Sequence, residues 1–524
     1  GAPHMLRRRT AIAIATLALL VMGACSDDGG GDPVDVGGGT SEGGGGSGEG
    51  GTLIAAISGE PDRLDPHLTT AYPSFQVLEN VYDTLVQPGD DLTFEPALAE
   101  EWETSDDNLT WTFTLREGVT WHNGRDFVAD DVVYSYERIM DEETAAANAY
   151  RFESIESVTA PDDTTVVIEL SRPTPNLLAN IGAFKGMAIV PEEIVEDGSI
   201  DTEPVGTGPF TFVSQSPDGE IVLERNEDYW QEGLPELDGV TFRPIPDPTV
   251  QLTNLQTGEV DWTDGVPPQQ VESLSGSDDI VVEAVPGGDY WYMAFNLERE
   301  PFGDVDVRRA IAFALDREAI TEAAKFEAAT VNQTAIPAES FFHYDYAPFE
   351  QQVDQAATLL EDAGASDLTM DLMVTNEFPE TVTAAQVIAD QLSEIGITVE
   401  IRELGFSEWL DQQGEGNFDS FLLGWLGNID PDDFYYAQHR TDASFNFHGY
   451  SNPEVDELLD AAREETDEEA RKELYDEAVK IIVDEVSYLY LYNPDVVNAW
   501  TPAVEGYSTR PDAAIRFVET SLAE

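Results

Sequence analysis

Regular alternation of apolar and polar residues identifies the clearest strand in the chain. In Thr110–Leu115, the side chains of Trp111, Phe113 and Leu115 fall on one face of an extended segment and threonines on the other. Further runs have the length and composition of strands: Thr165–Leu170, Ile221–Arg225, Asp279–Val285, Trp291–Leu297, Thr369–Thr375, Ile397–Leu404, Phe418–Trp425 and Val486–Tyr492. These runs predict a sheet-rich body that begins at Thr52.

Between the strands, apolar residues recur at the spacing of a helix. Two clear series are Val132-Val133-Tyr136-Ile139-Met140 and Val307-Ala310-Ile311-Ala314-Leu315. Near the C-terminus, Asn452 and Pro453 predict the start of one helix, and the spacing of Thr466 and Glu469 predicts the start of the next. Strands and helices alternate without a long linker after residue 51, and no repeat is visible. The pattern therefore predicts an α/β fold of interleaved or closely apposed domains.

The first 24 residues have the pattern of an export signal. Gly1–His4 precede Met5 and are interpreted as residues left from cloning. The basic run Arg7–Arg9 is followed by the small apolar run Ala11–Ala24. That run is shorter than the about 20 apolar residues that span a bilayer. We therefore predict a signal peptide over residues 5–24.

Cys25 is the only cysteine of the chain and follows Met22-Gly23-Ala24. Small residues before a cysteine are similar to a bacterial lipobox, in which signal peptidase cuts ahead of the cysteine and its thiol carries lipid. Residues 26–51 are mostly glycine with aspartate and glutamate, which predicts a flexible tether with an r.m.s. span of about 30 Å. The body is thus expected at the cell surface or the periplasmic face, anchored by this lipid alone. The general secretory and twin-arginine export routes both stay open.

The chain is strongly acidic, with 104 Asp and Glu against 25 Lys and Arg and a net charge of −79. Such a field excludes binding to nucleic acid or to an anionic membrane surface as the main role. The acids are spread along the chain, as expected of a solvated surface. We predict a salt-loving (halophilic) source, because the Debye length of about 3 Å at 1 M salt screens self-repulsion. An acidic extracellular protein is the alternative.

A search for catalytic motifs gives no enzyme. The chain contains no phosphate-binding loop, no His-Glu-x-x-His and no cysteine-based metal site, so no cofactor or metal is expected. The one Gly-x-Ser-x-Gly match, Gly39–Gly43, lies in the tether, where no strand-to-helix elbow can form. His122, His439 and His448 are interpreted as structural hydrogen-bonding residues. The empty search favours binding over catalysis.

Aromatic residues near strand ends give the best candidate for a binding site. Trp425 ends the strand-like run Phe418–Trp425 and enters a loop bounded by Gly424 and Pro431. Ligands of open α/β sheets bind at the carboxyl ends of strands. We therefore predict that Trp425 stacks on a ligand with Asn428 and Asp430 as polar contacts. Further wall candidates are Tyr72, Trp291 and Trp409.

A series of motifs occurs in a fixed order through the body: Leu64-Asp65-Pro66, Trp121-His122-Asn123-Gly124, Val205–Phe210, Arg225–Trp230, Gly258–Asp261, Phe295-Asn296, Asp306–Ala310, Ala314–Arg317 and Tyr450–Asp456. Together they resemble the family 5 extracellular solute-binding proteins, the peptide- and nickel-type receptors of ABC importers. The resemblance runs from about residue 52 to the C-terminus.

The resemblance implies a two-lobed α/β fold of the periplasmic-binding-protein type (type II). The first lobe is expected over residues 52–295 and 490–524, with an extra subdomain near 97–203, and the second lobe over 296–489. Two strands, near Met293–Asn296 and Leu489–Tyr492, are expected to connect the lobes as a hinge. A ligand is enclosed when such lobes close.

The resemblance also implies a role: a monomeric receptor that captures a small solute, in the first place a peptide, and delivers it to a permease–ATPase complex. Members that bind dipeptides hold the amine with an aspartate where this chain has Asn428, with Asp430 two residues later. They hold the carboxylate with an arginine after the strand at 369–375. Here no basic residue lies between Lys325 and Arg402. A ligand with little net negative charge is therefore expected.

Several alternatives stay open. Longer peptides, an oligosaccharide or another hydrogen-bonding solute fit the altered anchors. A surface sensor or adhesin can reuse the same fold, since fold does not fix function. A secreted hydrolase requires a nucleophile–base pair in the cleft, and the sequence shows none.

Overall fold

The fold is taken from a computed structural model that describes residues 50–89, 92–184, 187–425 and 429–523. The predicted signal peptide, Cys25, the tether and Asn428 lie outside these ranges. Within them, no helix combines the length and the apolar character that crossing a bilayer requires.

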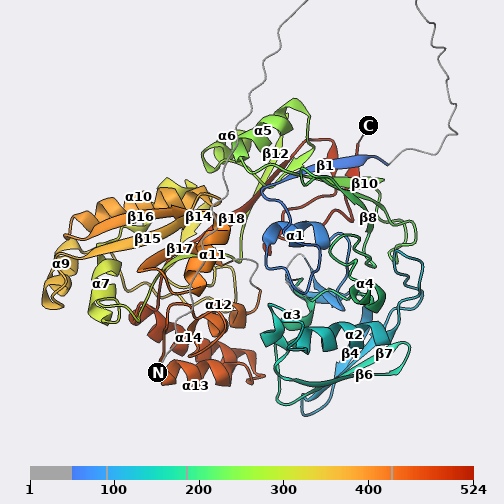
Figure 1. The fold of residues 1–524 in the computed structure, drawn as a ribbon, viewed down its shortest axis with the longest axis horizontal. Coiled ribbons are helices and arrows are strands. Elements are labelled where there is room, and N and C mark those ends of the chain that lie inside the picture. Colours follow the sequence, from blue (N-terminus) through green and yellow to red (C-terminus); the bar gives the residue numbers. More distant parts are fainter. Residues whose placement is uncertain (1–49, 90–91, 185–186, 426–428, 524) are drawn as a thin grey trace, which may run out of the picture. The chain divides into compact units, whose positions relative to one another are not determined.

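A 12-stranded sheet, counted over the described residues, runs through the body (Figure 1). Its strand order is β16-β15-β17-β13-β18-β11-β1-β10-β9-β8, and β12 and β14 also pair with β18. Strand β18 (Tyr488–Trp500) changes partners along its length. Its first part pairs with β13 and β14, and its second part, from Asp495, pairs with β12 and β11. One strand thus belongs to both ends of the sheet.

Separate hydrophobic cores divide the body. We define the second lobe by the core that includes residues from Tyr290 to Tyr492, and the first lobe by the cores that include Leu53 to Phe517. A further core, formed by residues between Leu85 and Ile189, defines the subdomain. In Figure 1 the elements of the second lobe, yellow to red, lie together on the left.

The first lobe and its subdomain contain most of the antiparallel strands. The first lobe comprises β1 (Thr52–Ile57), α1 (Tyr72–Leu78), β8 (Phe210–Gln215), β9 (Ile221–Arg225), β10 (Gly239–Pro244), α5 (Pro248–Thr257), β11 (Trp262–Thr263), α6 (Val271–Leu274), β12 (Val281–Pro286), β19 (Val504–Glu505) and β20 (Ser521–Leu522). The subdomain comprises β2 (Val86–Pro88), β3 (Phe94–Pro96), β4 (Ala99–Thr104), β5 (Thr110–Leu115), α2 (Ala129–Met140), the short 3-10 helix η1 (Ala149–Phe152), β6 (Ile155–Asp162), β7 (Thr165–Leu170), α3 (Leu177–Gly182) and α4 (Glu192–Glu196).

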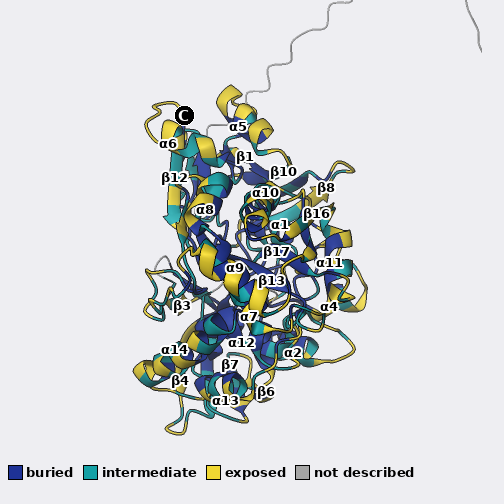
Figure 2. Ribbon diagram, turned by 90° about the vertical axis from the view of Figure 1, so that its left-hand side faces the viewer, coloured by how far each residue is buried: buried dark blue, intermediate teal, exposed yellow. Residues whose placement is uncertain are grey.

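The second lobe alternates strands and helices. It comprises β13 (Tyr290–Phe295), α7 (Val305–Ala314), α8 (Arg317–Lys325), β14 (Ala329–Val331), α9 (Val353–Asp362), β15 (Thr369–Thr375), α10 (Pro379–Ser393), β16 (Thr398–Leu404), α11 (Phe406–Gly414), β17 (Ser420–Trp425), α12 (Pro431–His439), α13 (Pro453–Ala462) and α14 (Glu468–Asp484). Its central strands are buried, whereas helices such as α9 expose their outer faces (Figure 2). The α/β prediction is confirmed.

Local signals explain several boundaries. Asn452 caps α13 by accepting the N–H of Glu454 at 2.9 Å, with Pro453 in the first turn, as predicted. Helix α14 begins later than predicted, because Asp467 caps it by accepting the N–H of Ala470 at 3.0 Å. The prediction that Thr466 starts this helix was wrong.

Strand β18 includes the predicted hinge segment Leu489–Tyr492 and contributes residues to the cores of both lobes. All of Tyr290–Phe295 and the start of β18 pack in the core of the second lobe, although the sequence prediction assigned β13 to the first lobe. The predicted strand Val486–Tyr492 ends before Pro494, whereas β18 continues through Pro494 to Trp500. A proline is tolerated in a strand where pairing changes, and here the partner changes from β14 to β12. The domain boundaries themselves stay a prediction.

Two of the ordered motifs have a structural role. The side chain of His122 contacts the carbonyl of Gly208 at 2.9 Å through Nε2, and its Nδ1 accepts the N–H of Gly206 at 3.2 Å. A side chain on Gly206 would lie 1.8 Å from the carbonyl oxygen of Val81, so only glycine fits there. His122 is thus a structural hydrogen-bonding residue, as predicted.

Candidate ligand site

Strand β17 places Trp425 at its carboxyl end, where the second lobe approaches the subdomain. The indole is half-buried, and its Nε1 donates to the backbone carbonyl of Asp433 at 3.1 Å. Its ring meets Phe445 edge to face at 4.8 Å, and Phe445 meets Tyr150 of the subdomain at 5.9 Å. These half-buried rings form an aromatic surface that extends from one lobe to the other.

Trp291 does not share this surface. It lies opposite Gly424 in the β13–β17 ladder, whereas Tyr290 lies opposite Trp425. Directly opposite residues of a strand pair point to the same face, and successive residues alternate. Trp291 and Trp425 therefore lie on opposite faces of the sheet. A side chain on Gly424 would come within 2.8 Å of the Trp291 ring, which explains the glycine before Trp425.

The fold brings a cation to the Trp291 side. The Lys325 ammonium lies 5.6 Å from the Trp291 ring centroid and donates to Glu380 at 2.7 Å. Its side chain remains 18% exposed. Lys325 ends α8 and Phe378, which contacts Trp291 at 5.8 Å, precedes α10. The contact between Lys325 and Trp291 could not be predicted from the sequence. Lys325 precedes the stretch after β15, where a basic residue was sought, by about fifty residues.

The remaining wall candidates are separate. Trp409 is fully buried and packs against Phe421 at 5.2 Å, in the core of the second lobe. Its burial accounts for it as a packing residue, so we leave it out of the proposed site. Tyr72 begins α1 in the first lobe, where its hydroxyl donates to the carbonyl of Ala513 at 2.6 Å. Tyr72 thus belongs to the first lobe, and Trp409 belongs to the core of the second lobe.

Asp430 is occupied by contacts within the second lobe. Its two carboxylate oxygens accept hydrogen bonds from Arg471 at 2.7 and 2.8 Å, and it caps α12 by accepting the N–H of Asp432 at 3.0 Å. These contacts neutralise its charge and fix its position. The expectation that Asp430 holds a ligand amine therefore loses its support, and Asn428 lies outside the described residues.

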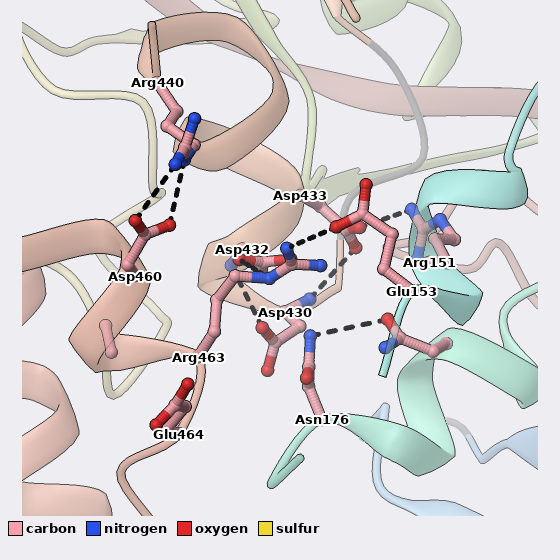
Figure 3. A network of polar contacts seen from close by, with 12 residues as sticks. Arg151, Glu153, Asn176, Asp430, Asp432, Asp433, Arg440, Asp460, Arg463 and Glu464 are labelled. Atoms are coloured by element: carbon pink, nitrogen blue, oxygen red, sulfur yellow. Dashed lines mark hydrogen bonds and ion pairs between the residues drawn. The ribbon is translucent and has the colours of Figure 1, made fainter. Parts of the chain in front are cut away.

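An ionic network joins the start of α12 to the subdomain (Figure 3). Asp433 pairs with Arg151, and both are buried. Arg463 lies between Asp432, at 3.2 Å, and Glu153 of the subdomain, at 3.3 Å. Burial raises the pKa of Asp432 to about 6 despite the nearby guanidinium of Arg463. No pattern in the sequence indicates these pairs, since Arg151 and Asp433 are 282 residues apart.

A serine between two histidines lies elsewhere in the second lobe. The Ser487 hydroxyl is 2.8 Å from Nδ1 of His439 and 2.9 Å from Nε2 of His448. All three residues are fully buried. A nucleophile needs access to its substrate, so this arrangement is a core hydrogen-bond network and adds nothing to the hydrolase alternative.

Two cavities lie away from Trp425. One of about 170 Å³ is lined by residues 330–333, 337–339, 343 and 345–347 together with Asn493 and Asp495 of β18. The other, of about 30 Å³, is lined by residues including Glu79, Asp83 and Arg516. The smaller is the size of a buried water site. Among the described residues, no group of three His, Cys, Asp or Glu side chains is arranged to bind a metal.

Comparison with known proteins gives a consistent result. The model of the family described as "Bacterial extracellular solute-binding proteins, family 5 Middle" matches residues 93–447. The chain is 27% identical over 483 residues to the glutathione-binding protein GsiB of Pectobacterium atrosepticum, covering 90% of this chain and 94% of that protein.

Solved structures agree. The periplasmic binding protein DppA of Helicobacter pylori, in complex with the peptide STSA, superposes with a TM-score of 0.83 at 29% identity, covering 91% of this chain and 99% of that one. The binding protein AgaA of A. tumefaciens R10, in complex with agropinic acid, gives 0.83 at 27% identity, covering 90% and 99%. These structures confirm the predicted two-lobed fold.

Proposed function

The chain belongs to the family 5 bacterial extracellular solute-binding proteins, and from that premise we propose that it captures a short peptide between its lobes. An ABC importer then receives the peptide from the closed receptor. The observation that carries the proposal is the half-buried aromatic surface of Trp425, Phe445 and Tyr150, which extends from one lobe to the other at the end of β17. Aromatic faces at a strand end, with backbone groups beside them, suit a peptide.

Relatives support a peptide in particular. GsiB is named for glutathione, itself a short peptide, and DppA was solved with the peptide STSA. A peptide carries a carboxylate, for which the sequence offered no partner near β15. Lys325 lies nearby, but it is paired with Glu380 at 2.7 Å and sits beside Trp291, on the face of the sheet opposite to Trp425, so we assign it no contact with the solute.

A panel of three probes tests the proposal: the peptide Ser-Thr-Ser-Ala, glutathione and agropinic acid. Calorimetry on purified protein from which bound solute has been removed should give saturable binding of at least one of the two peptides. Agropinic acid represents the second candidate function, binding of a non-peptide solute. The support for this candidate is that AgaA was solved in complex with agropinic acid. Binding of agropinic acid without binding of either peptide would contradict the proposal of a peptide receptor. The absence of binding for all three probes would contradict it as well.

We further propose that the receptor is a monomer anchored by lipid on Cys25 outside the cytoplasm. The support is the order of basic run, apolar run, cysteine and glycine-rich tether in the sequence. In an exporting host, Cys25→Ser should release the body from the membrane into the soluble fraction, as judged by fractionation and by mass spectrometry of the N-terminal fragment. Retention of this variant on the membrane contradicts the anchor.

A further inference from the structure

Arg151 and Asp433 meet across the two lobes, and each is held firmly on its own side. Arg151 belongs to η1, whose next residue, Phe152, packs in the subdomain core. Asp433 belongs to α12, whose next residue, Phe434, packs in the core of the second lobe. Rotation of one lobe away from the other therefore separates the two charges.

The pair is almost completely buried, with side-chain exposures of 3% for Arg151 and 4% for Asp433. Its neighbours across the lobes are exposed by comparison: Glu153 is 52% exposed and Glu464, which faces Arg172 at 3.8 Å, is 54% exposed. Among the described residues, the interface thus combines one dry ion pair with pairs that include a more exposed carboxylate. Buried charges interact far more strongly than exposed ones. Removing one partner of a buried pair is costly, because the other charge stays buried without compensation.

Asp433 also organises the segment that carries Trp425. One of its oxygens accepts the N–H groups of Ile429 and Asp430, at 3.2 and 3.3 Å, and its backbone carbonyl accepts Nε1 of Trp425. The other oxygen accepts from Nη2 of Arg151. The carboxylate that meets the opposite lobe is therefore the group that fixes the start of α12 and the Trp425 indole.

We propose that Arg151 and Asp433 form a buried ionic latch: closure of the lobes makes the pair, and the pair positions the Trp425 surface against the subdomain for ligand capture. Both are positioning residues, and neither is assigned a contact with the solute. The inference rests on the proposed function, because it concerns the same interlobe surface.

The structure also predicts an asymmetry between the two partners. Without Arg151, Asp433 keeps two backbone N–H donors and the N-terminus of α12. Without the Asp433 charge, Arg151 loses its ion-pair partner and keeps only Asp432 as a nearby carboxylate. Its Nε and Nη1 are already buried without a hydrogen-bond partner among the described residues. An uncompensated buried cation is costly. Loss of the aspartate charge should therefore impair closure more than loss of the arginine.

The test is a double-mutant cycle on Asp433→Asn and Arg151→Met, read out as the dissociation constant for Ser-Thr-Ser-Ala or glutathione, whichever binds the parent more tightly. Asparagine keeps an oxygen for the backbone N–H groups and removes only the charge. We expect Asp433→Asn to weaken binding by about 100-fold or more and Arg151→Met by about 10-fold. Adding Arg151→Met to Asp433→Asn should restore binding by at least about 10-fold.

The matched control is Arg440→Met. Arg440 pairs bidentately with Asp460 at 2.9 and 3.2 Å, close to the latch (Figure 3), but both residues belong to the second lobe. This variant should bind within about threefold of the parent. Small-angle X-ray scattering on the peptide-loaded proteins should give a larger radius of gyration for Asp433→Asn than for the parent or for Arg440→Met.

Independent effects of the two substitutions, with no rescue in the double variant, would overturn the latch, and so would parent-like binding by a folded Asp433→Asn. If neither peptide binds the parent, the proposed function fails and the latch is decided on the free protein. In that case the radius of gyration of the free protein should be larger for Asp433→Asn than for the parent, and the double variant should have the radius of the parent. Equal radii for the parent, Asp433→Asn and the double variant would overturn the latch.

Discussion

Two polar clusters of the molecule are built for different purposes. Around Ser487, in the core of the second lobe, His439 bonds Ser487 and the Tyr490 hydroxyl, both at 2.8 Å, and every partner comes from the same lobe. Around Asp433, the partners come from both lobes, and Arg151 keeps buried nitrogens without a hydrogen-bond partner among the described residues. The first cluster lies within one core. The second spans the two lobes, so it contains the charges that the proposed latch separates when the lobes move apart.

Charge state differs in the same way. The Ser487 cluster uses neutral histidines, and burial, with Arg308 nearby, lowers the pKa of His448 to about 3. The Asp433 cluster uses ion-paired Arg and Asp side chains, whose desolvation is large. Buried ion pairs also occur within the second lobe, as between Arg471 and Asp430. The comparison teaches that the Arg151–Asp433 pair is set apart by the origin of its partners in different lobes, and not by charge alone.

The largest expected effect is a loss of stability on removing a side chain from the core of the second lobe. Trp409→Ala removes a fully buried indole from the second lobe and should lower the free energy of unfolding by about 3–5 kcal/mol. Urea denaturation followed by tyrosine fluorescence and circular dichroism measures this loss. Affinity of the remaining folded protein for a peptide should stay close to that of the parent. A stable Trp409→Ala that fails to bind would place Trp409 in the ligand site after all.

The next effect is a pH dependence of opposite sign for buried histidines and for the buried Asp432. Burial lowers the pKa of His122 to about 4 and that of His448 to about 3. Their contribution to stability is complete above about pH 6.5. It is lost as the pH falls toward 3–4, by about 1.4 kcal/mol per pH unit for each histidine, because only the unfolded chain takes up the proton.

Asp432 behaves in the opposite way. Its pKa is raised to about 6, so its contribution is present below about pH 4 and is lost as the pH rises through 6. Melting temperatures of the parent, His448→Gln and Asp432→Asn between pH 4 and 8 separate the two. His448→Gln should reduce the loss of stability in acid, and Asp432→Asn should reduce the loss between pH 4 and 6. Identical pH profiles for all three proteins would contradict this account.

A smaller effect concerns salt, and it tests the halophile prediction. With a net charge of −79, molar sodium chloride should raise the melting temperature by several degrees because it screens repulsion between exposed acids. The buried Arg151–Asp433 pair is shielded from salt, so Asp433→Asn should weaken peptide binding similarly at low and high salt. A melting temperature that is flat or falls with salt contradicts the halophile prediction.

The sequence predicted the fold well because the fold depends on local patterns. Alternation in Thr110–Leu115 gave β5 at its true bounds, and Asn452 gave the start of α13. Where local patterns were ambiguous, the prediction failed. The predicted strand Val486–Tyr492 was too short, because β18 continues through Pro494 to Trp500, where its partner changes from β14 to β12.

The candidate site was predicted only in part, for a physical reason. Trp425 was identified because a strand end followed by glycine is visible locally. Its relation to Trp291 depends on strand register, which puts the two rings on opposite faces. The partners of Asp430 and Asp433, namely Arg471 and Arg151, come from distant segments and carry no sequence signature.

The most direct test of the central claim compares Trp425→Ala with Trp409→Ala. Both remove a tryptophan of the second lobe, but only Trp425 is half-exposed at the interlobe surface. Calorimetry with Ser-Thr-Ser-Ala and glutathione, paired with urea denaturation, measures binding and stability on the same preparations.

We expect Trp425→Ala to weaken peptide binding by about 1–3 kcal/mol, a loss of about 5- to 150-fold, with little change in the free energy of unfolding. Trp409→Ala should show the reverse. Parent-like binding by a folded Trp425→Ala would contradict the placement of the ligand site at the end of β17.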